Sequence, residues 1–417
     1  MNIIVKKCST LEGKIEISGS KNACLPIIGA ALLTTEKVII NNVPLISDVV
    51  SFIRILDNIN VDSNYDYNNR RLEIFASKMG KKIESPYINK FRASYYIIPS
   101  LLHRLKEFEF DYPGGCNFGS RPIDIHLDFF RNVGVDVIEG PKMKFKIKKL
   151  NPINYTFSTI SVGATINAIM TCCKISGKSI LKNASIEPEV LEVINMLNLM
   201  GAKIKVLNKR IIEIDGVKKL NGVTYEVMPD RIEFGSYALL ALIMPKSNIT
   251  ITNFNLEYIK NILDIIIKLG GSYENINNNC IKIKSPININ SINIQTGPYP
   301  LFPTDLQPIL STVLLKASAK SEINETIYIN RNSHIVELKK AGANIIMEKG
   351  NITIYPSTLN TESLRAYDLR CGFAMIVAAI LCNKECKIYD VDYILRGYEN
   401  IVEKLKSINV DCEIERE

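Results

Sequence analysis

The stretch Lys340-Ala341-Gly342-Ala343-Asn344 closes an apolar helical pattern with a glycine and leads into a run of apolar residues. A helix commonly ends with a residue in the left-handed conformation, where glycine carries no steric penalty and asparagine is the usual substitute. Two short strands follow, Ile345-Ile346-Met347 and Ile352-Thr353-Ile354, separated by a turn. The stretch therefore predicts one structural unit, a helix followed by paired strands.

The same pattern recurs along the whole chain, about every 70 residues. Each repeat turns at a glycine or an asparagine, and these pivots are Asn60, Gly134, Gly201, Gly270, Gly342 and Asn409. A helix, a glycine and a strand follow one another in many α/β proteins, but six occurrences at a nearly constant period indicate an internal repeat. A chain of 417 residues is also long for a single hydrophobic core. We expect an α/β protein with two similar halves of three units each, and a ligand between the halves.

The composition is that of an ordinary globular protein, with 47% hydrophobic and 23% charged residues. The longest apolar stretch, Ala374 to Cys382, is shorter than the roughly 20 residues of a membrane span, and the first residues lack the apolar core of an export signal. The ten cysteines include no C-x-x-C pair, so we expect reduced thiols, no metal site and a cytoplasmic protein. The net charge of +8 favours anionic partners, but it is not gathered into a Lys/Arg block, so we expect no nucleic acid partner.

One segment, residues 113–126, surrounds a cysteine with three glycines and places an arginine after it. Gly114 and Gly115 allow backbone conformations that other residues avoid, which is typical of a lid-like loop. A cationic group near a thiol lowers its pKa, so Cys116 followed by Arg121 is a candidate reactive cysteine. Buried, inert cysteines are the commoner case, and the residues alone leave both interpretations open.

Other segments place polar residues at predicted helix starts. Ser18-Gly19-Ser20-Lys21-Asn22 resembles an anion site at a helix N-terminus, although its spacing is not that of a Walker A loop. Three prolines fix the approach to Asp305, which is either the N-cap of the next helix or a base placed to take a proton from a hydroxyl. Single arginines are more often surface residues, but their geometry suits phosphate and carboxylate. The candidates of this kind are Arg92, Arg370 and Arg396.

Together these segments resemble the UDP-N-acetylglucosamine 1-carboxyvinyltransferase family, the enolpyruvyl transferases that begin peptidoglycan precursor synthesis. The resemblance runs collinearly from about Leu11 to Glu403. Its motifs are Ser-Gly-x-Lys-Asn at 18–22, Arg-Ala-Ser at 92–94, Gly-Gly-Cys…Arg-Pro-x-Asp-x-His at 114–126, Ser-Val-Gly-Ala-Thr at 161–165, Pro-Asp-Arg-Ile-Glu at 229–233, Phe-Pro-Thr-Asp at 302–305, Asn-Arg at 330–331, Asp-Leu-Arg at 368–370 and Arg-Gly-Tyr-Glu at 396–399. No single motif is decisive, but their order is highly specific.

The resemblance implies a fold of two domains, each an inside-out α/β barrel of three βα units. It assigns residues 21–229 to a catalytic domain that carries the cysteine loop, and residues 1–20 with 230–417 to a second domain, with the active site in the cleft between them. It also implies a reaction without a cofactor, in which the 3′-hydroxyl of UDP-N-acetylglucosamine adds to C2 of phosphoenolpyruvate and phosphate then leaves.

The resemblance further implies the roles of individual residues. Asp305 orients or deprotonates the hydroxyl, and Cys116 protonates C3 of phosphoenolpyruvate or forms a covalent adduct with it. The residues implied to bind phosphoenolpyruvate, of which Lys21 and Arg396 are also catalytic, are Lys21, Asn22, Arg121, Arg331, Arg370 and Arg396. Those implied to bind the UDP-sugar are Asn22, Arg92, Arg121, Pro122, Ile123, Asp124, Ile125, Thr159, Ile160, Ser161, Val162, Gly163, Asp305 and Ile327.

The chain departs from the family pattern at Ile329, Asn332 and Leu395, where the family usually has Glu, Phe and Asp. These departures leave open a paralogue that acts on another UDP-sugar, or a degenerate one that only binds it. The shikimate-pathway enolpyruvyl transferase shares the fold, but its family lacks the Gly-Gly-Cys loop, so Cys116 argues against it.

Overall fold

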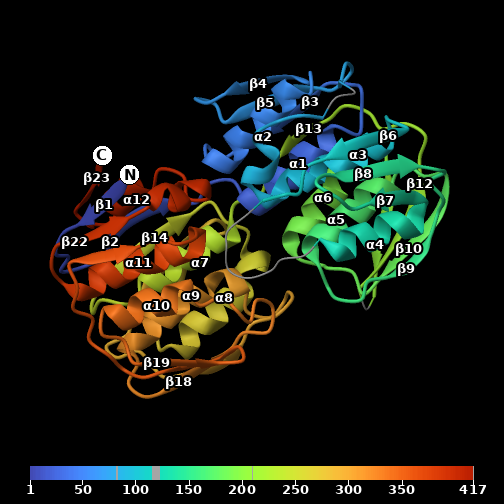
Figure 1. Cartoon of the computed structure of the whole chain (residues 1–417). Helices are drawn as coiled ribbons and strands as arrows, with labels where there is room; N and C mark the ends of the chain where they lie inside the picture. The colour runs from blue at the N-terminus through green and yellow to red at the C-terminus, as the bar shows by residue number, and fades with distance from the viewer. Residues whose placement is uncertain (81–82, 115–122, 209, 417) are drawn as a thin grey trace. The chain divides into compact units, whose positions relative to one another are not determined.

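The computed structural model describes residues 1–80, 83–114, 123–208 and 210–416, and the chain divides into two compact units (Figure 1). Unit one contains Met1–Ser18 and the chain from Pro229 onward, and unit two contains the described residues between Gly19 and Met228. Three residues of the candidate site, Cys116, Arg121 and Pro122, lie outside the described residues. The assignment of the catalytic role to residues 21–229 stays a prediction.

The described part of unit one contains three four-stranded sheets. In the first, the order is β21 (Ser363–Arg365), β22 (Cys386–Tyr389), β1 (Asn2–Val5) and β23 (Cys412–Glu415). In the second, it is β15 (Ser272–Asn277), β16 (Cys280–Lys284), β14 (Asn248–Thr252) and β2 (Glu12–Glu16). In the third, it is β17 (Asn293–Gln295), β18 (Ser321–Asn324), β20 (Asn351–Ile354) and β19 (Ile345–Glu348). The two ends of the chain are therefore neighbours, because β1 and β23 pair antiparallel.

Unit two repeats this arrangement in its described residues. One sheet has the order β13 (Thr224–Glu226), β3 (Val38–Asn41), β5 (Arg71–Phe75) and β4 (Asp62–Asp66). The next has the order β9 (Asn154–Thr156), β10 (Gly177–Lys182), β12 (Ile211–Gly216) and β11 (Lys203–Leu207). The last has three strands, β6 (Glu107–Phe110), β8 (Met143–Ile147) and β7 (Val135–Ile138).

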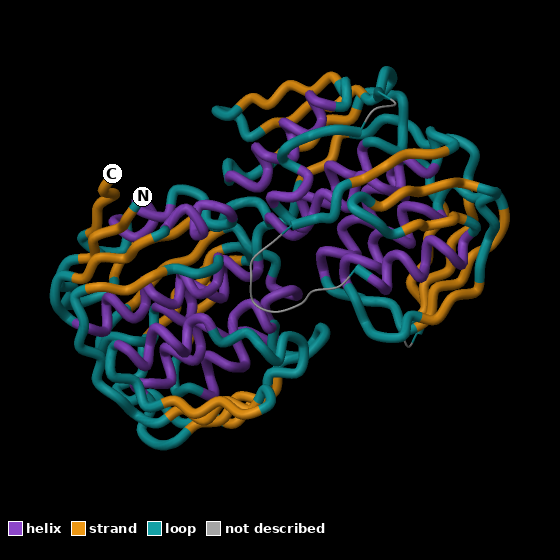
Figure 2. Tube along the Cα trace, in the orientation of Figure 1, coloured by secondary structure: helices purple, strands orange, loops and turns teal. Residues whose placement is uncertain are grey.

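Helices fill the interior of each unit and the sheets lie outside them (Figure 2). The central helices of unit one are α7 (Arg231–Leu240), α9 (Gln307–Val313) and α11 (Leu369–Cys382). Those of unit two are α1 (Lys21–Ala31), α3 (Ile98–Leu102) and α5 (Val162–Cys172). The other α-helices are α2 (Ser47–Asn58), α4 (Asp124–Val133), α6 (Pro188–Leu199), α8 (Leu256–Lys268), α10 (Ser333–Lys340) and α12 (Ile401–Lys406). Short 3₁₀ helices are η1 (Ile88–Lys90), η2 (Arg92–Ile97), η3 (Thr304–Leu306), η4 (Leu314–Lys316) and η5 (Val391–Arg396).

The burial pattern explains why the central helices lie inside. A helix that is apolar on all sides is stable only when it is covered on all sides. Every residue of α7 and α9 is buried, and so is α11 from Leu369 to Ile380. In the outer helix α8 the buried residues fall on one stripe and are Ile259, Ile262, Leu263, Ile265 and Ile266. The predicted inside-out α/β architecture is therefore confirmed.

The pivots of the repeat adopt the backbone conformation that the sequence predicts. Four are glycines with positive φ, between 88° at Gly270 and 110° at Gly134. The other two are Asn60 and Asn409, with φ of 55° and 66°. Each ends a helix and turns the chain into the next strand, so the left-handed conformation expected at these six positions is confirmed.

Two equivalent strands stand next to the points where the chain changes units. β2, which precedes α1 in the chain, pairs in parallel with β14 of unit one. β13, which precedes α7, pairs in parallel with β3 of unit two. The chain passes from one unit to the other directly after each of these strands, at Ser18 and at Met228. Each strand therefore lies in the same unit as the sheet that it completes, while the helix that follows it lies in the other unit.

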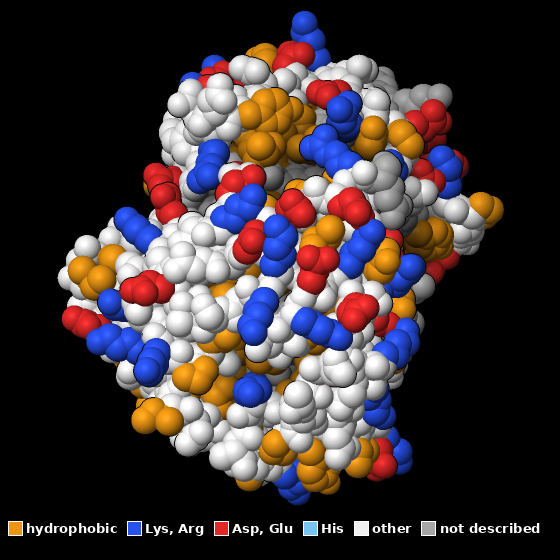
Figure 3. Space-filling view, turned by 90° about the vertical axis from the view of Figure 1, so that its left-hand side faces the viewer, with side chains coloured by type: hydrophobic (Ala, Val, Ile, Leu, Met, Phe, Trp, Pro, Cys, Tyr) orange, Lys and Arg blue, Asp and Glu red, His pale blue; other side chains and the backbone are white. Residues whose placement is uncertain are grey.

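The surface carries charges of both signs, and no described helix is both long and apolar enough to span a membrane. On the face drawn in Figure 3, lysine and arginine side chains are interspersed with aspartate and glutamate.

Each cysteine in the described part of the chain is a free thiol. Most of these cysteines are buried, and only Cys280 and Cys382 are partly exposed. The cysteines thus contribute to the core as small apolar residues.

We predict that Gly201→Ala lowers the free energy of unfolding by about 1–2 kcal/mol, because φ is +100° there and a side chain disfavours that conformation. The site has room for a methyl group, since the nearest atom lies 3.5 Å from the added Cβ. Urea denaturation measures the effect. Gly140→Ala is the control, because its added Cβ would also have its nearest atom at an ordinary contact distance, 3.6 Å from the Lys142 carbonyl oxygen, and its φ is not in the left-handed region. Equal stability of both variants would contradict the strain argument.

We also predict that stability falls as the pH drops from about 6.5 toward 4, the range between the ordinary histidine pKa and the lowered values. Burial lowers the pKa of each histidine, to about 4 for His103 and about 3 for His126 and His334. Below pH 6.5 the unfolded chain binds protons that the folded chain does not, at about 1.4 kcal/mol per pH unit for each histidine. Urea denaturation at several pH values measures this slope. His103→Gln should reduce it by about one third, and a flat profile would show that the histidines are not buried neutral.

Candidate active site

Six of the sequence motifs occupy equivalent places in the two units, because each of these six lies at the start of a central helix. In unit one they precede α7, α11 and the η3–α9 segment, and in unit two they precede α1, α5 and the η2–α3 segment. Backbone N–H groups at a helix start lack a partner within the helix and carry a partial positive charge. The repeat therefore delivers three such helix starts in each unit, and these suit anionic groups.

Side chains cap several of these helix starts. The caps are Ser20 on α1, Ser161 on α5, Asp230 on α7 and Asp368 on α11. Asp305 does not cap a helix, because Pro303 occupies the cap position of η3 and Asp305 lies within that turn. The alternative that Asp305 is merely an N-cap is therefore wrong, and its carboxylate is available for other contacts.

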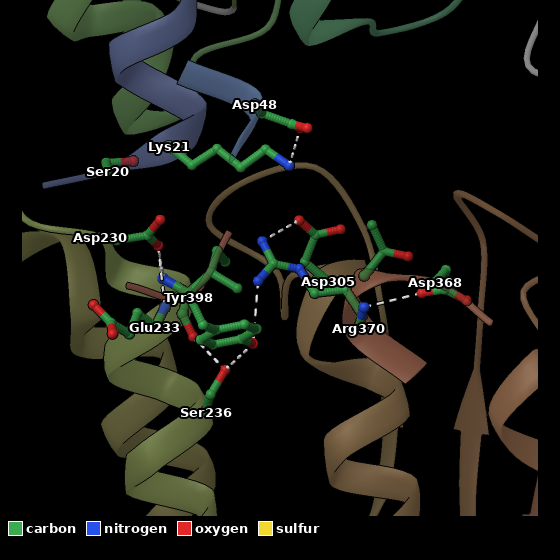
Figure 4. Close-up of polar contacts among 12 residues, drawn as sticks. Ser20, Lys21, Asp48, Asp230, Glu233, Ser236, Asp305, Asp368, Arg370 and Tyr398 are labelled. Carbon is green, nitrogen blue, oxygen red and sulfur yellow. Dashed lines mark hydrogen bonds and ion pairs between the residues drawn. The ribbon is translucent and has the colours of Figure 1, made fainter. Parts of the chain in front are cut away.

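The Asp305 carboxylate lies between two guanidinium groups in unit one. Its Oδ1 accepts a hydrogen bond from Arg331 Nη1 at 3.1 Å. Its Oδ2 accepts one from Arg370 Nη2 at 3.0 Å (Figure 4). Both arginine side chains are buried, whereas 24% of the Asp305 side chain is exposed. The carboxylate is held on both sides and still faces solvent.

This arrangement fixes the ionisation of Asp305 and Arg370. Burial raises the pKa of the Asp305 carboxyl, but the attraction of Arg370 and Arg331 outweighs burial and holds the pKa far below its usual range. Burial lowers the pKa of Arg370, but Asp305 more than compensates and raises it. Asp305 is therefore ionised at neutral pH, and in this state it is a poor proton acceptor because the two guanidinium groups hold its pKa so low.

Arg370 is held in place by contacts that do not involve Asp305. Its Nη1 donates to the Tyr398 hydroxyl at 3.1 Å, and Tyr398 in turn exchanges a hydrogen bond of 2.7 Å with Ser236 on α7 (Figure 4). Asp368 Oδ1 accepts from the backbone N–H of Arg370 at 2.9 Å, which fixes the first turn of α11. Asp368 Oδ2 accepts from Ser333 Oγ at 2.5 Å. The Arg370 guanidinium is thus held by buried groups whose own positions are fixed by hydrogen bonds.

Arg331 is held by the segment that carries Asp305. Its Nη1 also donates to the Thr304 carbonyl at 2.5 Å and lies 3.1 Å from Thr304 Oγ1. Thr304 Oγ1 donates to Glu325 Oε2 at 2.9 Å, and Glu325 Oε1 accepts from the backbone N–H groups of residues 327 and 328. Glu325 is 1% exposed. The buried Glu325 carboxylate therefore fixes the Thr304 side chain, which is next to Asp305, and the backbone that leads to Arg331.

In unit two, Lys21 is the first residue of α1, as the motif predicts. Its Nζ forms an ion pair of 2.7 Å with Asp48 on α2, which is buried. Asn22 follows Lys21 in the first helical turn and is partly exposed. The ion pair orients a lysine at the positive end of a helix, which is an arrangement that suits a phosphate group.

A second group of motif residues packs tightly in the same unit. Arg92 lies over the ring of Tyr95 at 5.8 Å, and that ring lies 4.4 Å from the His126 ring. His126 Nδ1 is 3.0 Å from the side-chain amide of Asn167 on α5. A Cβ on Gly163 would lie 2.3 Å from the Tyr95 hydroxyl oxygen. The motif glycine therefore allows the start of α5 to approach the η2 segment closely.

The remaining predicted residues divide between the units. In unit two, Ile123 precedes α4, Asp124 and Ile125 belong to its first turn, and Thr159 to Val162 lead into α5. In unit one, Ile327 is 37% exposed and Arg396 ends η5. Among the described residues, no group of three or more His, Cys, Asp or Glu side chains could hold a metal ion.

Sequence reasoning missed several residues that build this site. They are Asp48, Ser236, Glu325, Ser333, Asp368 and Tyr398. Asp368 and Tyr398 stand inside quoted motifs, so the motifs located them without a role. Ser236 and Tyr398 are 162 positions apart in the chain, and such a contact leaves no local pattern in the sequence.

The chain is similar over nearly its whole length to one protein family and to proteins of two streptococci. The model of the family described as EPSP synthase (3-phosphoshikimate 1-carboxyvinyltransferase) matches residues 5–405. UDP-N-acetylglucosamine 1-carboxyvinyltransferase 2 of Streptococcus pyogenes serotype M1 is 38% identical over 418 residues, which cover 99% of both chains. The UDP-N-acetylglucosamine 1-carboxyvinyltransferase of Streptococcus pneumoniae serotype 2 is 38% identical over 420 residues, again 99% of both chains.

Solved structures show the same fold at lower sequence identity. The enolpyruvyl transferase NikO from Streptomyces tendae superposes with a TM-score of 0.90 at 19% identity, over 99% of this chain and 98% of that one. EPSP synthase from Acinetobacter baumannii superposes with a TM-score of 0.75 at 13% identity, over the whole of both chains. Because the family model spans nearly the whole chain and full-length relatives are 36–38% identical to it, this protein belongs to the 1-carboxyvinyl (enolpyruvyl) transferase family and is an enzyme of that family.

Proposed function

We propose that this enzyme transfers the enolpyruvyl group of phosphoenolpyruvate to the 3′-hydroxyl of UDP-N-acetylglucosamine and releases phosphate. In the cytoplasm this reaction begins the synthesis of peptidoglycan precursors. The observation that carries the proposal is the full-length similarity to relatives that are named for this acceptor, at 36–38% identity. The buried arginine pair supports it, because fixed guanidinium groups suit the carboxylate of phosphoenolpyruvate.

The proposed reaction is an addition followed by an elimination. A carboxylate takes the hydroxyl proton while the oxygen bonds to C2 of phosphoenolpyruvate, and the electron pair of the C2–C3 double bond takes up a proton at C3. Phosphate then leaves with the electrons of its C–O bond, and C3 gives up a proton so that the double bond returns. Donors that are already in place stabilise the charge that develops in both steps.

The side chains divide these tasks in the proposal. Asp305 takes the hydroxyl proton, and Cys116, which lies outside the described residues, supplies the proton to C3. Arg331 and Arg370 bind the carboxylate of phosphoenolpyruvate. The cations that bind its phosphate are Lys21, Arg121 and Arg396, and Asn22 also binds phosphoenolpyruvate. The UDP-sugar contacts are Arg92, Pro122, Ile123, Asp124, Ile125, Thr159, Ile160, Ser161, Val162, Gly163 and Ile327.

A second candidate acceptor is another UDP-sugar. The observation that favours it is the pair of exposed residues on either side of buried Arg331, Ile329 and Asn332. Ile329 is 53% exposed and carries no charge, whereas the family usually has a glutamate there. A change of charge beside a substrate-binding arginine alters which acceptor fits. The two candidates share the reaction and differ only in the sugar.

We predict that the purified enzyme releases phosphate when it receives both phosphoenolpyruvate and UDP-N-acetylglucosamine. A coupled phosphate assay measures the rate, and omission of the acceptor is the control. UDP-glucose and UDP-N-acetylgalactosamine, tested in parallel, distinguish the two candidate acceptors. A higher kcat/KM with one of these sugars would favour the second candidate, and no release with any of them would refute the proposed function.

We predict that Cys116→Ala lowers kcat by at least about a hundredfold, because it removes the proposed general acid. The rate of phosphate release measures the loss. Cys280→Ala is the matched control, since Cys280 is a partly exposed thiol on β16, outside the proposed site. Fosfomycin, an epoxide that alkylates the family's loop cysteine, should label the Cys116 peptide and leave the Cys280 peptide unlabelled in mass spectrometry. An unchanged kcat in Cys116→Ala would remove this thiol from the mechanism.

A further inference from the structure

The contacts of Asp305 conflict with the task that the proposed function gives it. A general base needs a lone pair directed at the proton that it removes and a pKa high enough to accept that proton. Here Oδ1 accepts a bond from Arg331 and Oδ2 accepts one from Arg370, and the two positive charges hold the pKa of the carboxyl far below its usual range. These two arginines are also the groups that the proposed function assigns to the carboxylate of phosphoenolpyruvate. The same pair of guanidinium groups thus binds Asp305 in the structure and the carboxylate of phosphoenolpyruvate in the proposed function.

We propose that the carboxylate of phosphoenolpyruvate displaces Asp305 from Arg331 and Arg370, and that this exchange releases Asp305 to act on the acceptor hydroxyl. Without substrate, Asp305 occupies the place between the two arginines that the substrate carboxylate takes when it binds. The inference rests on the proposed function and deepens it, because it states when the base becomes active. Without phosphoenolpyruvate the base is masked, and with it the base is free.

The arginines keep their positions when Asp305 leaves, because other groups hold them. Arg370 keeps its bond to Tyr398 at 3.1 Å and remains on the capped first turn of α11. Arg331 keeps its bonds to Thr304 and lies over the Tyr328 ring at 4.9 Å. The receptor for a carboxylate is therefore preorganised, and the exchange does not require the guanidinium groups to move.

A link between the two arginine segments strengthens this argument. Ser333, two residues after Arg331, donates to Asp368 at 2.5 Å, and Asp368 stands two residues before Arg370. Together with the two bonds of Asp305, this contact closes a ring from Arg331 through Ser333 and Asp368 to Arg370. When Asp305 leaves, its two bonds to the arginines break and the Ser333–Asp368 bond remains. The Ser333–Asp368 bond then still joins the two segments that carry the arginines.

Asp305 can leave more easily than the arginines can. Its side chain is 24% exposed, whereas those of Arg331 and Arg370 are 3% and 5% exposed. A buried guanidinium that loses its partner carries a large desolvation cost, so it needs a replacement carboxylate. A partly exposed carboxylate can instead regain water. The exchange therefore replaces one ion pair by an equivalent one and leaves Asp305 solvated.

Charges on the neighbouring elements act on the same pair of arginines. Asp230 at the start of α7 raises the pKa of Arg370, as Asp305 and Tyr398 do. Arg331 lowers and Asp368 raises the pKa of the buried imidazole of His334 on α10. Asp230 and Asp368 are both engaged as helix caps. Asp305 is the carboxylate of this group that spans both guanidinium groups and is partly exposed.

The exchange makes a prediction that a simple binding role for Asp305 does not. Asp305→Asn and Asp305→Ala should bind phosphoenolpyruvate about tenfold more tightly than the parent, because the internal competitor is gone, while turnover is lost. Isothermal titration calorimetry with phosphoenolpyruvate measures the affinity, with and without UDP-N-acetylglucosamine. All proteins carry Cys116→Ser, so that no covalent adduct forms during the titration.

The control for charge is Asp264→Asn, which removes one negative charge from the exposed face of α8 in the same unit. Its affinity for phosphoenolpyruvate should equal that of the parent. In an Arg370→Lys background the gain from Asp305→Asn should shrink, because half of the shared receptor is altered. Equal tightening by Asp264→Asn, or an undiminished gain in the Arg370→Lys background, would overturn the exchange in favour of general electrostatics.

A stability measurement covers the case in which the Asp305 variants fold poorly. Asp305→Ala leaves two buried guanidinium groups without their carboxylate, so its Tm should fall. Acetate should then restore Tm in Asp305→Ala and change it little in the parent, because a free carboxylate fills the vacated place. A lack of selective rescue by acetate would contradict a preorganised receptor.

The outcome is separable from a failure of the proposed function. Phosphate release by the unmodified enzyme tests the function itself. If that enzyme is active and the Asp305 variants bind phosphoenolpyruvate as the parent does or more weakly, the exchange is wrong and the function stands. Tighter binding together with acetate rescue supports the exchange.

Discussion

Two buried guanidinium groups that share one carboxylate determine the organisation of unit one. Arg331 and Arg370 are almost completely removed from water, and a buried cation is tolerated only when it is paired and hydrogen-bonded. Asp305 supplies that pairing, and it joins three segments that are remote in sequence. Arg370 donates to Tyr398 and follows the Asp368 cap of α11, and Arg331 donates to Thr304, so both arginines have few alternative positions. This constraint links the architecture to the chemistry, because the same positions suit a carboxylate that arrives as substrate.

The repeat explains how such a site arises. Each unit places three apolar helices at its centre, and the start of each central helix bears a functional motif. A chain built from copies of one unit therefore delivers equivalent, positively polarised helix ends, which divergence then equips with different side chains. β2 and β13 each complete a sheet of their own unit, and the chain enters the other unit, at a central helix, directly after each of them.

The fold was predictable from sequence because its decisive feature is local. A glycine or asparagine at the end of a helix requires positive φ, and this signal appears at each pivot without knowledge of any distant contact. The site was predictable only in part. The motifs pointed to Asp305, Arg331 and Arg370, but the sequence did not reveal that they bind one another, since Asp305 and Arg370 are 65 positions apart. The pairing of β2 with β14 was equally hidden, because neither strand carries a pattern that identifies its partner.

The departures from the family pattern acquire a physical meaning in this setting. A glutamate at position 329 is one way to orient the neighbouring arginine, yet Ile329 is exposed and Arg331 is held by Thr304 and Asp305 instead. The loss of that carboxylate therefore does not release the arginine. It leaves Asp305 as the carboxylate that balances both guanidinium groups, with a side chain that still reaches solvent. An arginine pair that depends on one partly exposed carboxylate is well suited to exchange it for another.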